Sequence, residues 1–217
     1  MTEIKTWLRR NLPLFFDKAN SMETLEIPIF PLNAVLFPGG MLPLRVFEQR
    51  YMDMTKACLK DDQPFGICLI KEGNEVGETA VPEEIGCLVR IADWDMQQLG
   101  ILNLTAVGVQ RISIQSQKTE ANGLIRASVV TVTTEPPQPV PENLQACVTV
   151  LRRIVDEVGE DKFQVPLQYD DAVWVGYRLA EVLPLKLSAK QSMLEMNDSI
   201  MRLQILNKFL IQQGLTA

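Results

Sequence analysis

The chain has 217 residues, of which 47% are hydrophobic and 22% are charged, a composition typical of a soluble globular protein with a substantial core. Its formal net charge of −6 argues against nonspecific binding to nucleic acid, which requires a basic surface. No apolar run reaches the roughly 18 residues that span a bilayer, so no membrane span is predicted, and the cytoplasm is the expected compartment.

The sequence contains no histidine, and this absence excludes several kinds of catalytic and metal-binding site. It removes Ser-His-Asp and Cys-His arrangements and every imidazole ligand. Neither of the glycine-rich loops that hold nucleotide phosphates, GxxxxGK[ST] and GxGxxG, occurs. The four cysteines are widely separated without a CxxC pair, which predicts buried free thiols. We therefore expect a noncatalytic protein without a metal or a cofactor.

A leader of residues 1–24 opens the chain, and basic residues are interspersed among its apolar ones. This pattern predicts an amphipathic helix that is either packed on the protein or frayed. The alternative is an anchor to a membrane surface or to a partner protein.

Residues 27–51, IPIFPLNAVLFPGGMLPLRVFEQRY, form the most hydrophobic stretch and yet contain four prolines. Proline donates no hydrogen bond to a sheet, so it is confined to the starts of strands, to edges and to bulges. We therefore predict that one strand begins at Pro28 and that its pairing ends at Pro31. A second strand then runs from Met41 to Phe47, with Pro43 at an edge or a bulge.

The turn between these strands is predicted at Pro38-Gly39-Gly40, because glycine readily takes a positive φ. Two interpretations remain open for the charged and aromatic residues that follow the second strand. In the first, Arg45 and Glu48 form an internal ion pair. In the second, this part of the chain forms a surface that receives another polypeptide, with contacts from Phe47, Arg50 and Tyr51.

The remaining part of residues 25–134 is predicted to form one helix and several short antiparallel strands. The helix is expected at 48–60, where apolar residues recur at helical spacing. Runs rich in β-branched residues predict strands at 65–71, 85–94, 99–116 and 123–134. So many short strands favour a closed or nearly closed barrel.

A proline-rich connector, EPPQPVPE at residues 135–142, separates this part from a helical one at 143–217. The fold class is therefore α+β. In the helical part, Gly159 is expected to end the first helix, and Asp170 or Asp171 to cap the second. A capping box that begins at Ser188 and a cap at Asp198 are expected to open the last two helices.

The segment 27–51 resembles the opening signature of the Lon N-terminal domain family, the substrate-recognition module of ATP-dependent Lon proteases. Ile29 stands where that signature usually has Leu, and Val46 where it has Ile; both changes preserve apolar volume. The similarity extends over about residues 25 to 213. Its further parts are FGICLIK (65–71), Val76-Gly77, Ile85-Gly86, Gly108-Val109-Gln110-Arg111 and the closing stretch 178–206.

The resemblance implies a PUA-like antiparallel β-barrel (a pseudobarrel) with one inserted helix, followed by a C-terminal helical bundle. It also implies binding of unfolded or degradation-marked polypeptide rather than chemistry upon it. Neither the phosphate-binding loop of a Lon ATPase domain nor the Ser-Lys dyad of its protease domain has a counterpart. We therefore expect a free-standing substrate-binding domain.

The candidate peptide contacts are exposed apolar and aromatic residues together with one arginine: Phe37, Met41, Phe47, Arg50, Tyr51 and Trp94. The residues that shape the motif itself are Pro31, Pro38, Gly39, Pro43, Arg45 and Glu48. The expected partners are unfolded or partly folded polypeptide, and a protease or chaperone for which the protein acts as an adaptor; a homodimer is also open. The alternatives are an RNA-binding PUA-like domain and a hydrolase with an unrecognised carboxylate site.

Overall fold

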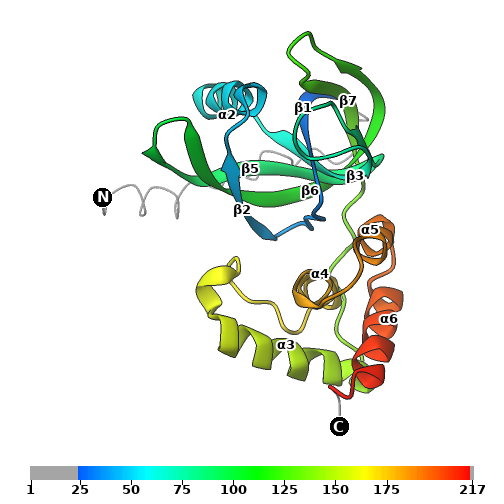
Figure 1. Cartoon of the computed structure of the whole chain (residues 1–217). Coiled ribbons are helices and arrows are strands. Elements are labelled where there is room, and N and C mark those ends of the chain that lie inside the picture. The colour runs from blue at the N-terminus through cyan, green and yellow to red at the C-terminus, as the bar shows by residue number, and fades with distance from the viewer. Residues whose placement is uncertain (1–23, 216–217) are drawn as a thin grey trace.

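The computed structural model describes residues 24–215, so nearly all of the expected leader lies outside the described residues. The strands and α2 form one unit, and helices α3 to α6 form a second unit beneath it (Figure 1). The strands are β1 Leu25–Leu32, β2 Met41–Val46, β3 Phe65–Glu72, β4 Val81–Pro82, β5 Ile85–Gln98, β6 Ile101–Thr119 and β7 Ile125–Thr131. The α-helices are α2 Gln49–Asp61, α3 Gln145–Val158, α4 Ala172–Val182, α5 Leu187–Glu195 and α6 Ser199–Gln212.

The sheet is mostly antiparallel, and its pairings close a ring. β1, β7, β6, β5 and β3 pair in this order, and β3 pairs in turn with β1. The β1–β3 pair is parallel, which corrects the expectation of antiparallel strands alone. The long strand β6 has β5 along one edge, whereas β2 and β7 pair with its first and second halves. The expected α+β class is confirmed.

The prolines of the opening motif occupy positions that only partly match the prediction. β1 begins at Leu25 and not at Pro28. Pairing with β7 stops at Ile29, whereas pairing with β3 continues through Pro31 to Leu32, one residue beyond the predicted end. Within residues 24–215, β2 pairs with β6 alone, and the predicted edge position of Pro43 is therefore confirmed.

The hairpin between β5 and β6 is longer than predicted. A turn was expected at residues 95–98, but the pairing continues until Gln98 opposes Ile101. The connection is therefore the two residues Leu99 and Gly100, of which Gly100 has a φ of +83°. A two-residue hairpin loop requires such a backbone conformation, and glycine takes it without strain.

Local capping signals determine three of the ends of the described helices. α3 ends at Gly159, whose φ is +95°, as predicted. The side chains of Asp171 and Asp198 accept hydrogen bonds at the starts of α4 and α6, so these two caps are also confirmed. The capping box at Ser188 is wrong, because α5 begins one residue earlier and has no side-chain cap.

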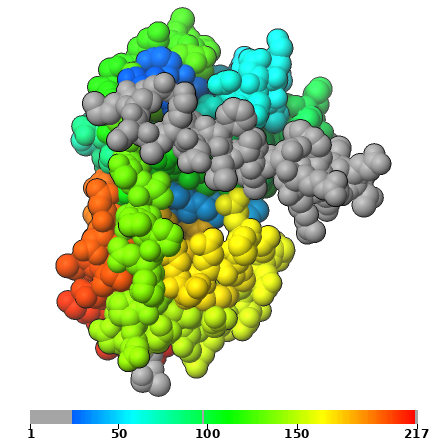
Figure 2. Space-filling view, turned by 180° about the vertical axis from the view of Figure 1, so that it is seen from behind, coloured from blue at the N-terminus to red at the C-terminus, as the bar shows by residue number. Residues whose placement is uncertain are grey.

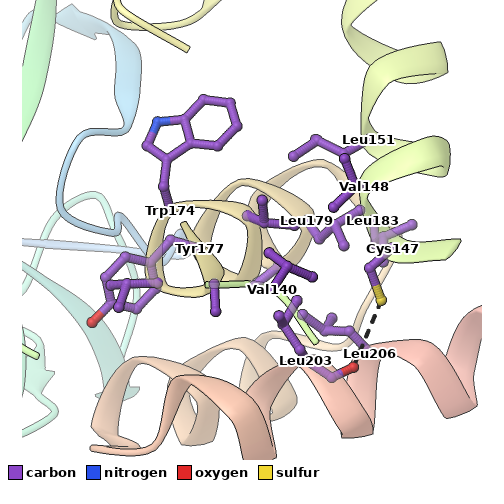
Figure 3. Close-up of a cluster of buried hydrophobic side chains, with 14 of the residues drawn as sticks. Val140, Cys147, Val148, Leu151, Trp174, Tyr177, Leu179, Leu183, Leu203 and Leu206 are labelled. Atoms are coloured by element: carbon purple, nitrogen blue, oxygen red, sulfur yellow. Dashed lines mark hydrogen bonds between the residues drawn. The ribbon is translucent and has the colours of Figure 1, made fainter. Parts of the chain in front are cut away.

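Two main hydrophobic cores fill the molecule, one inside the sheet and one among the helices. Figure 3 shows the second, in which α4 lies between α3 and α6. Nearly the whole of α4 is buried, including Trp174, Tyr177 and Leu179. The four cysteines are buried and free, as predicted. Burial raises the pKa of Cys58 to about 11 and that of Cys68 to about 12.

The connector after β7 carries the chain from the sheet to the helices across the face seen in Figure 2. Its first residue, Glu135, is buried and forms an ion pair with Arg202 of α6 at 2.6 Å. Tyr177 of α4 donates to the same carboxylate oxygen at 3.2 Å. A short 3₁₀ turn, Glu142–Leu144, then leads into α3. Buried polar contacts therefore fix the connector against the helical unit.

Candidate functional site

Three of the six candidate peptide contacts are buried, so the prediction that they form a binding surface is wrong. Phe37 has no exposed surface and packs against Tyr177, with 5.3 Å between the ring centroids. Tyr51 is stacked on Phe30 at 4.0 Å inside the sheet core. Arg50 is 7% exposed and donates to the carbonyl oxygen of Gly123.

The predicted ion pair between Arg45 and Glu48 does not form. Glu48 instead contacts Arg50, with 2.9 Å between the carboxylate oxygen and Nη2. Arg45 is exposed on β2, where Asn103 of β6 is its register partner. Arg45 is therefore at the surface and has no ion pair among residues 24–215, whereas Arg50 stabilises the interior.

Phe47 and Trp94 are exposed, at 54% and 53%, and remain candidates for contact with a partner. The register aligns Leu44 of β2, Leu104 of β6 and Trp94 of β5 across three neighbouring strands. Because directly paired residues project from the same face of a sheet, these three side chains form one row. Trp94 therefore extends an apolar row of the sheet into solvent.

A shallow groove of about 290 Å³ follows this row. We call it the hairpin groove; its lining includes Pro43, Leu44, Arg45, Asp93, Trp94 and Asp95. Beyond Trp94, the hairpin exposes Met96 and also Leu99, which is 95% exposed. The sequence does not predict Leu99 as a contact residue, because its apolar neighbours place it at the start of the strand expected at 99–116. The dipeptide Leu99-Gly100 between two strand-like runs was the available signal for an exposed turn.

A second cavity, of about 470 Å³, lies between the two units. We call it the interdomain cleft. Residues 33–36 and 39–42 of the sheet unit form one side, and residues of α3, α4, α5 and the α3–α4 loop form the other. Figure 2 shows the blue surface of the segment after β1 meeting the yellow surface of the α3–α4 region. Met41, the sixth candidate contact, is partly buried and lines this cleft.

Arg178 and Glu181 of α4 form the polar part of the cleft. Arg178 is 1% exposed, and its Nη2 donates to the carbonyl oxygen of Pro38 at 2.8 Å and to Glu181 at 3.1 Å. Its Nε lies 2.9 Å from Oε2 of Glu181, in an ion contact without hydrogen-bond alignment. Burial raises the pKa of Glu181 to about 7, although Arg178 acts in the opposite direction.

The glycines of the opening motif allow this close approach between the units. A Cβ on Gly40 would lie 2.0 Å from Oε1 of Glu181 and 2.9 Å from the backbone carbonyl oxygen of Phe37, so a larger residue would displace both groups. Gly39 has a φ of +74°, which confirms the turn predicted there. The amide of Gly39 donates to the carbonyl oxygen of Gly108 on β6 at 2.8 Å. The turn is therefore held between β6 and α4.

The described residues 24–215 hold no group of three or more Cys, Asp or Glu side chains arranged to bind a metal ion. Within the same residues, no helix is both long enough and apolar enough to cross a bilayer. The hairpin groove and the interdomain cleft are therefore the two candidate sites, and both are suited to binding by apolar contact and charge.

Comparison with known proteins identifies what this arrangement resembles. A family model of the ATP-dependent protease La (LON) substrate-binding domain matches residues 26–212. Lon protease 2 of Herpetosiphon aurantiacus is 24% identical over 204 residues, which cover 91% of this chain and 25% of that protein. The Lon protease of Neorickettsia sennetsu is 26% identical over 199 residues, covering 83% and 23%. The chain therefore spans about a quarter of the length of these curated relatives.

Solved structures support the same relationship. A Lon N-terminal domain protein from Xanthomonas campestris is 35% identical with a TM-score of 0.71, and the match covers 85% of this chain and 98% of that one. The N-terminal domain of Lon protease from the Mycobacterium avium complex shares the fold at a TM-score of 0.57 and 16% identity, over 84% of this chain and 96% of that one. The chain belongs to the family of ATP-dependent protease La (LON) substrate-binding domains.

Proposed function

We propose that this protein is a noncatalytic module that binds unfolded or degradation-marked polypeptide at the hairpin groove, for delivery to a protease or a chaperone in the cytoplasm. The observation that carries the proposal is the exposed Trp94 at the end of the apolar row, together with the exposed Leu99 at the tip of the hairpin. Exposed apolar surface of this kind marks binding sites for other chains. Membership of the substrate-binding family supports the same function.

The sheet supports binding in a second way. β2 pairs with β6 alone among the described strands, so its outer edge has backbone groups available to an extended chain. Pro43 interrupts the donors of this edge and limits uncontrolled pairing with other copies of the protein. The ring of strand pairings is consistent with the PUA-like pseudobarrel that we propose for this unit.

The test is the affinity for a permanently unfolded polypeptide, reduced and alkylated with iodoacetamide, measured by fluorescence anisotropy without ATP. We expect micromolar binding. The double variant Trp94→Ser/Leu99→Ser is expected to weaken it about tenfold, because both side chains lose apolar contact with the ligand. Ile211→Ser, which removes an equally exposed apolar side chain from α6, is the matched control and should bind normally.

Two results would contradict the proposal. One is the absence of binding by a protein whose circular dichroism confirms an intact fold. The other is equal weakening by the hairpin variant and by Ile211→Ser, which would indicate nonspecific adhesion to any exposed apolar side chain.

A further inference from the structure

We propose that the interdomain cleft binds the C-terminal end of a polypeptide, with the last apolar side chain inside the cleft and the α-carboxylate beside Lys190. The inference rests on the proposed function, because it identifies which part of a bound chain is recognised. It assigns a second site to the protein, distinct from the hairpin groove. Three features of the cleft lead to it.

The first feature is the apolar lining. The walls include Leu36, Met41, Leu42, Phe163, Val182 and Leu187. A volume of about 470 Å³ is within the range of roughly 300–1,000 Å³ that ligand pockets have, and it accommodates one or two residues of a peptide. Val158, also on the wall, is 48% exposed. Solvent therefore contacts apolar surface that a bound side chain would cover.

The second feature is the charge of the lining. Lys162, Arg178 and Lys190 contribute three cations and Glu181 one carboxylate, so the cleft is positive within a chain whose net charge is −6. Lys162 contacts the neighbouring Asp161 at 3.0 Å, but both side chains are well exposed, so water weakens this contact. Arg178 is 1% exposed, and its Nη1 has no hydrogen-bond partner among the described residues. Because Arg178 is buried, it adds positive charge to the cleft wall, and the two lysines are the cations that a ligand can reach.

A ligand with an apolar side chain and one carboxylate would match both the apolar lining and the positive charge of the cleft. In a polypeptide that combination occurs at the C-terminus, where the α-carboxylate is adjacent to the last side chain. An internal apolar segment presents neutral backbone at the same place and would gain nothing from the excess of positive charge in the lining. The chemistry of the lining therefore favours a chain end over an internal segment.

The third feature is the position of the cleft relative to β2. Met41 and Leu42 line the cleft, and the next three residues, 43–45, line the hairpin groove. Six strand residues extend about 20 Å, so the free edge of β2 joins the two cavities over the length of a short peptide. A chain whose last residue occupies the cleft can therefore run along β2 and place upstream apolar residues against Trp94.

The experiment compares one fluorescent ten-residue peptide, ending in Leu-Leu, as a free acid and as a C-terminal amide. We expect the acid to bind about fivefold more tightly than the amide, since an exposed charge pair contributes a factor of this size. Lys190→Met should remove this difference. Lys162→Met, a change at an exposed side chain that leaves folding intact, should reduce it. Lys208→Met on α6 is the matched control and should preserve it.

The outcomes separate this inference from the proposed function. Equal affinity for the acid and the amide would overturn the inference, even where Trp94→Ser/Leu99→Ser still weakens binding of unfolded polypeptide and so supports the proposed function. Unchanged discrimination in both Lys190→Met and Lys162→Met would overturn it as well. The opposite result is also distinguishable: the long unfolded polypeptide fails to bind, but N-acetyl-Leu-Leu perturbs the NMR signals of cleft residues as an acid and not as an amide. This result would support the cleft site and contradict the proposed function.

Discussion

Two buried arginines join the sheet unit to the helical unit, and their surroundings differ. Arg111 extends from β6, and its two terminal nitrogens donate to the carbonyl oxygens of Thr133, Leu194 and Met196 and to the side chain of Asn197. Arg178 extends in the opposite direction, from α4 to the loop after β1, and lies beside the interdomain cleft. One of its nitrogens has no partner among the described residues.

The difference shows how a single interface can combine rigidity with a binding site. At Arg111 the hydrogen bonds of both terminal nitrogens go mainly to backbone carbonyls, which hold one arrangement of the two units. At Arg178 the partner is a carboxylate with a raised pKa, and the neighbouring surface is hollow. We infer that the first contact stabilises the fold and that the second borders a site.

The largest expected effect tests the role assigned to Arg111. Arg111→Met removes four hydrogen bonds and leaves buried carbonyl oxygens without donors, so the free energy of unfolding should fall by about 3 kcal/mol. Urea denaturation followed by circular dichroism measures the change. Arg90→Met is the matched control: its ion pair with Asp62 is exposed, and we expect a loss of less than about 0.5 kcal/mol. A loss of similar size in both variants would contradict the comparison.

A second prediction concerns Glu181 and the pH dependence of stability. Its pKa is raised from 4.5 to about 7 in the folded protein, so the folded state binds the proton more tightly than the unfolded state. Its contribution to stability is therefore present at low pH and is lost as the pH rises from about 4.5 through 7. Because the side chain is 19% exposed, we expect a change of about 2 kcal/mol rather than the full value of the shift.

Glu181→Gln removes the titrating group, and its unfolding free energy should therefore lose this component of the pH dependence. The measurement is a series of urea denaturations between pH 4 and pH 8 on the wild type and the variant. If the difference between the two proteins stays constant over this range, the pKa of Glu181 is the same in the folded and unfolded states, which would contradict the raised pKa.

The local signals in the sequence predicted much of this architecture. The fold class, the edge position of Pro43, the turn at Gly39 and the caps at Asp171 and Asp198 were all correct. Each depends on a residue whose backbone preference or side-chain acceptor acts within a few positions of the chain. Such signals need no knowledge of the tertiary fold.

The errors have a different physical origin. Phe37 was taken for a surface residue, but it packs against Tyr177, which lies 140 positions later. Arg111 lies on a strand, and no local signal predicts that the end of α5 and the segment after it accept its hydrogen bonds. Whether an aromatic residue in a loop or an arginine on a strand is buried depends on contacts between segments that are distant in the sequence. The local sequence pattern does not predict such contacts. The parallel pairing of β1 with β3 was missed for the same reason.

The smallest expected effect concerns Lys190. Its ammonium group donates to the backbone carbonyl oxygen of Glu181 at 2.7 Å, and its charge lowers the pKa of the Glu181 side chain. Lys190→Met should reduce stability by only about 0.5–1 kcal/mol, because one hydrogen bond of a half-buried side chain is lost. It should also raise the pKa of Glu181 further, so that the pH-dependent loss of stability extends to higher pH. The same denaturation series measures both changes, and Lys208→Met serves as the control. If the pH dependence of stability is the same in Lys190→Met and the wild type, the charge of Lys190 does not act on Glu181. The cleft would then lack the interaction between charged side chains that distinguishes it from the contact at Arg111.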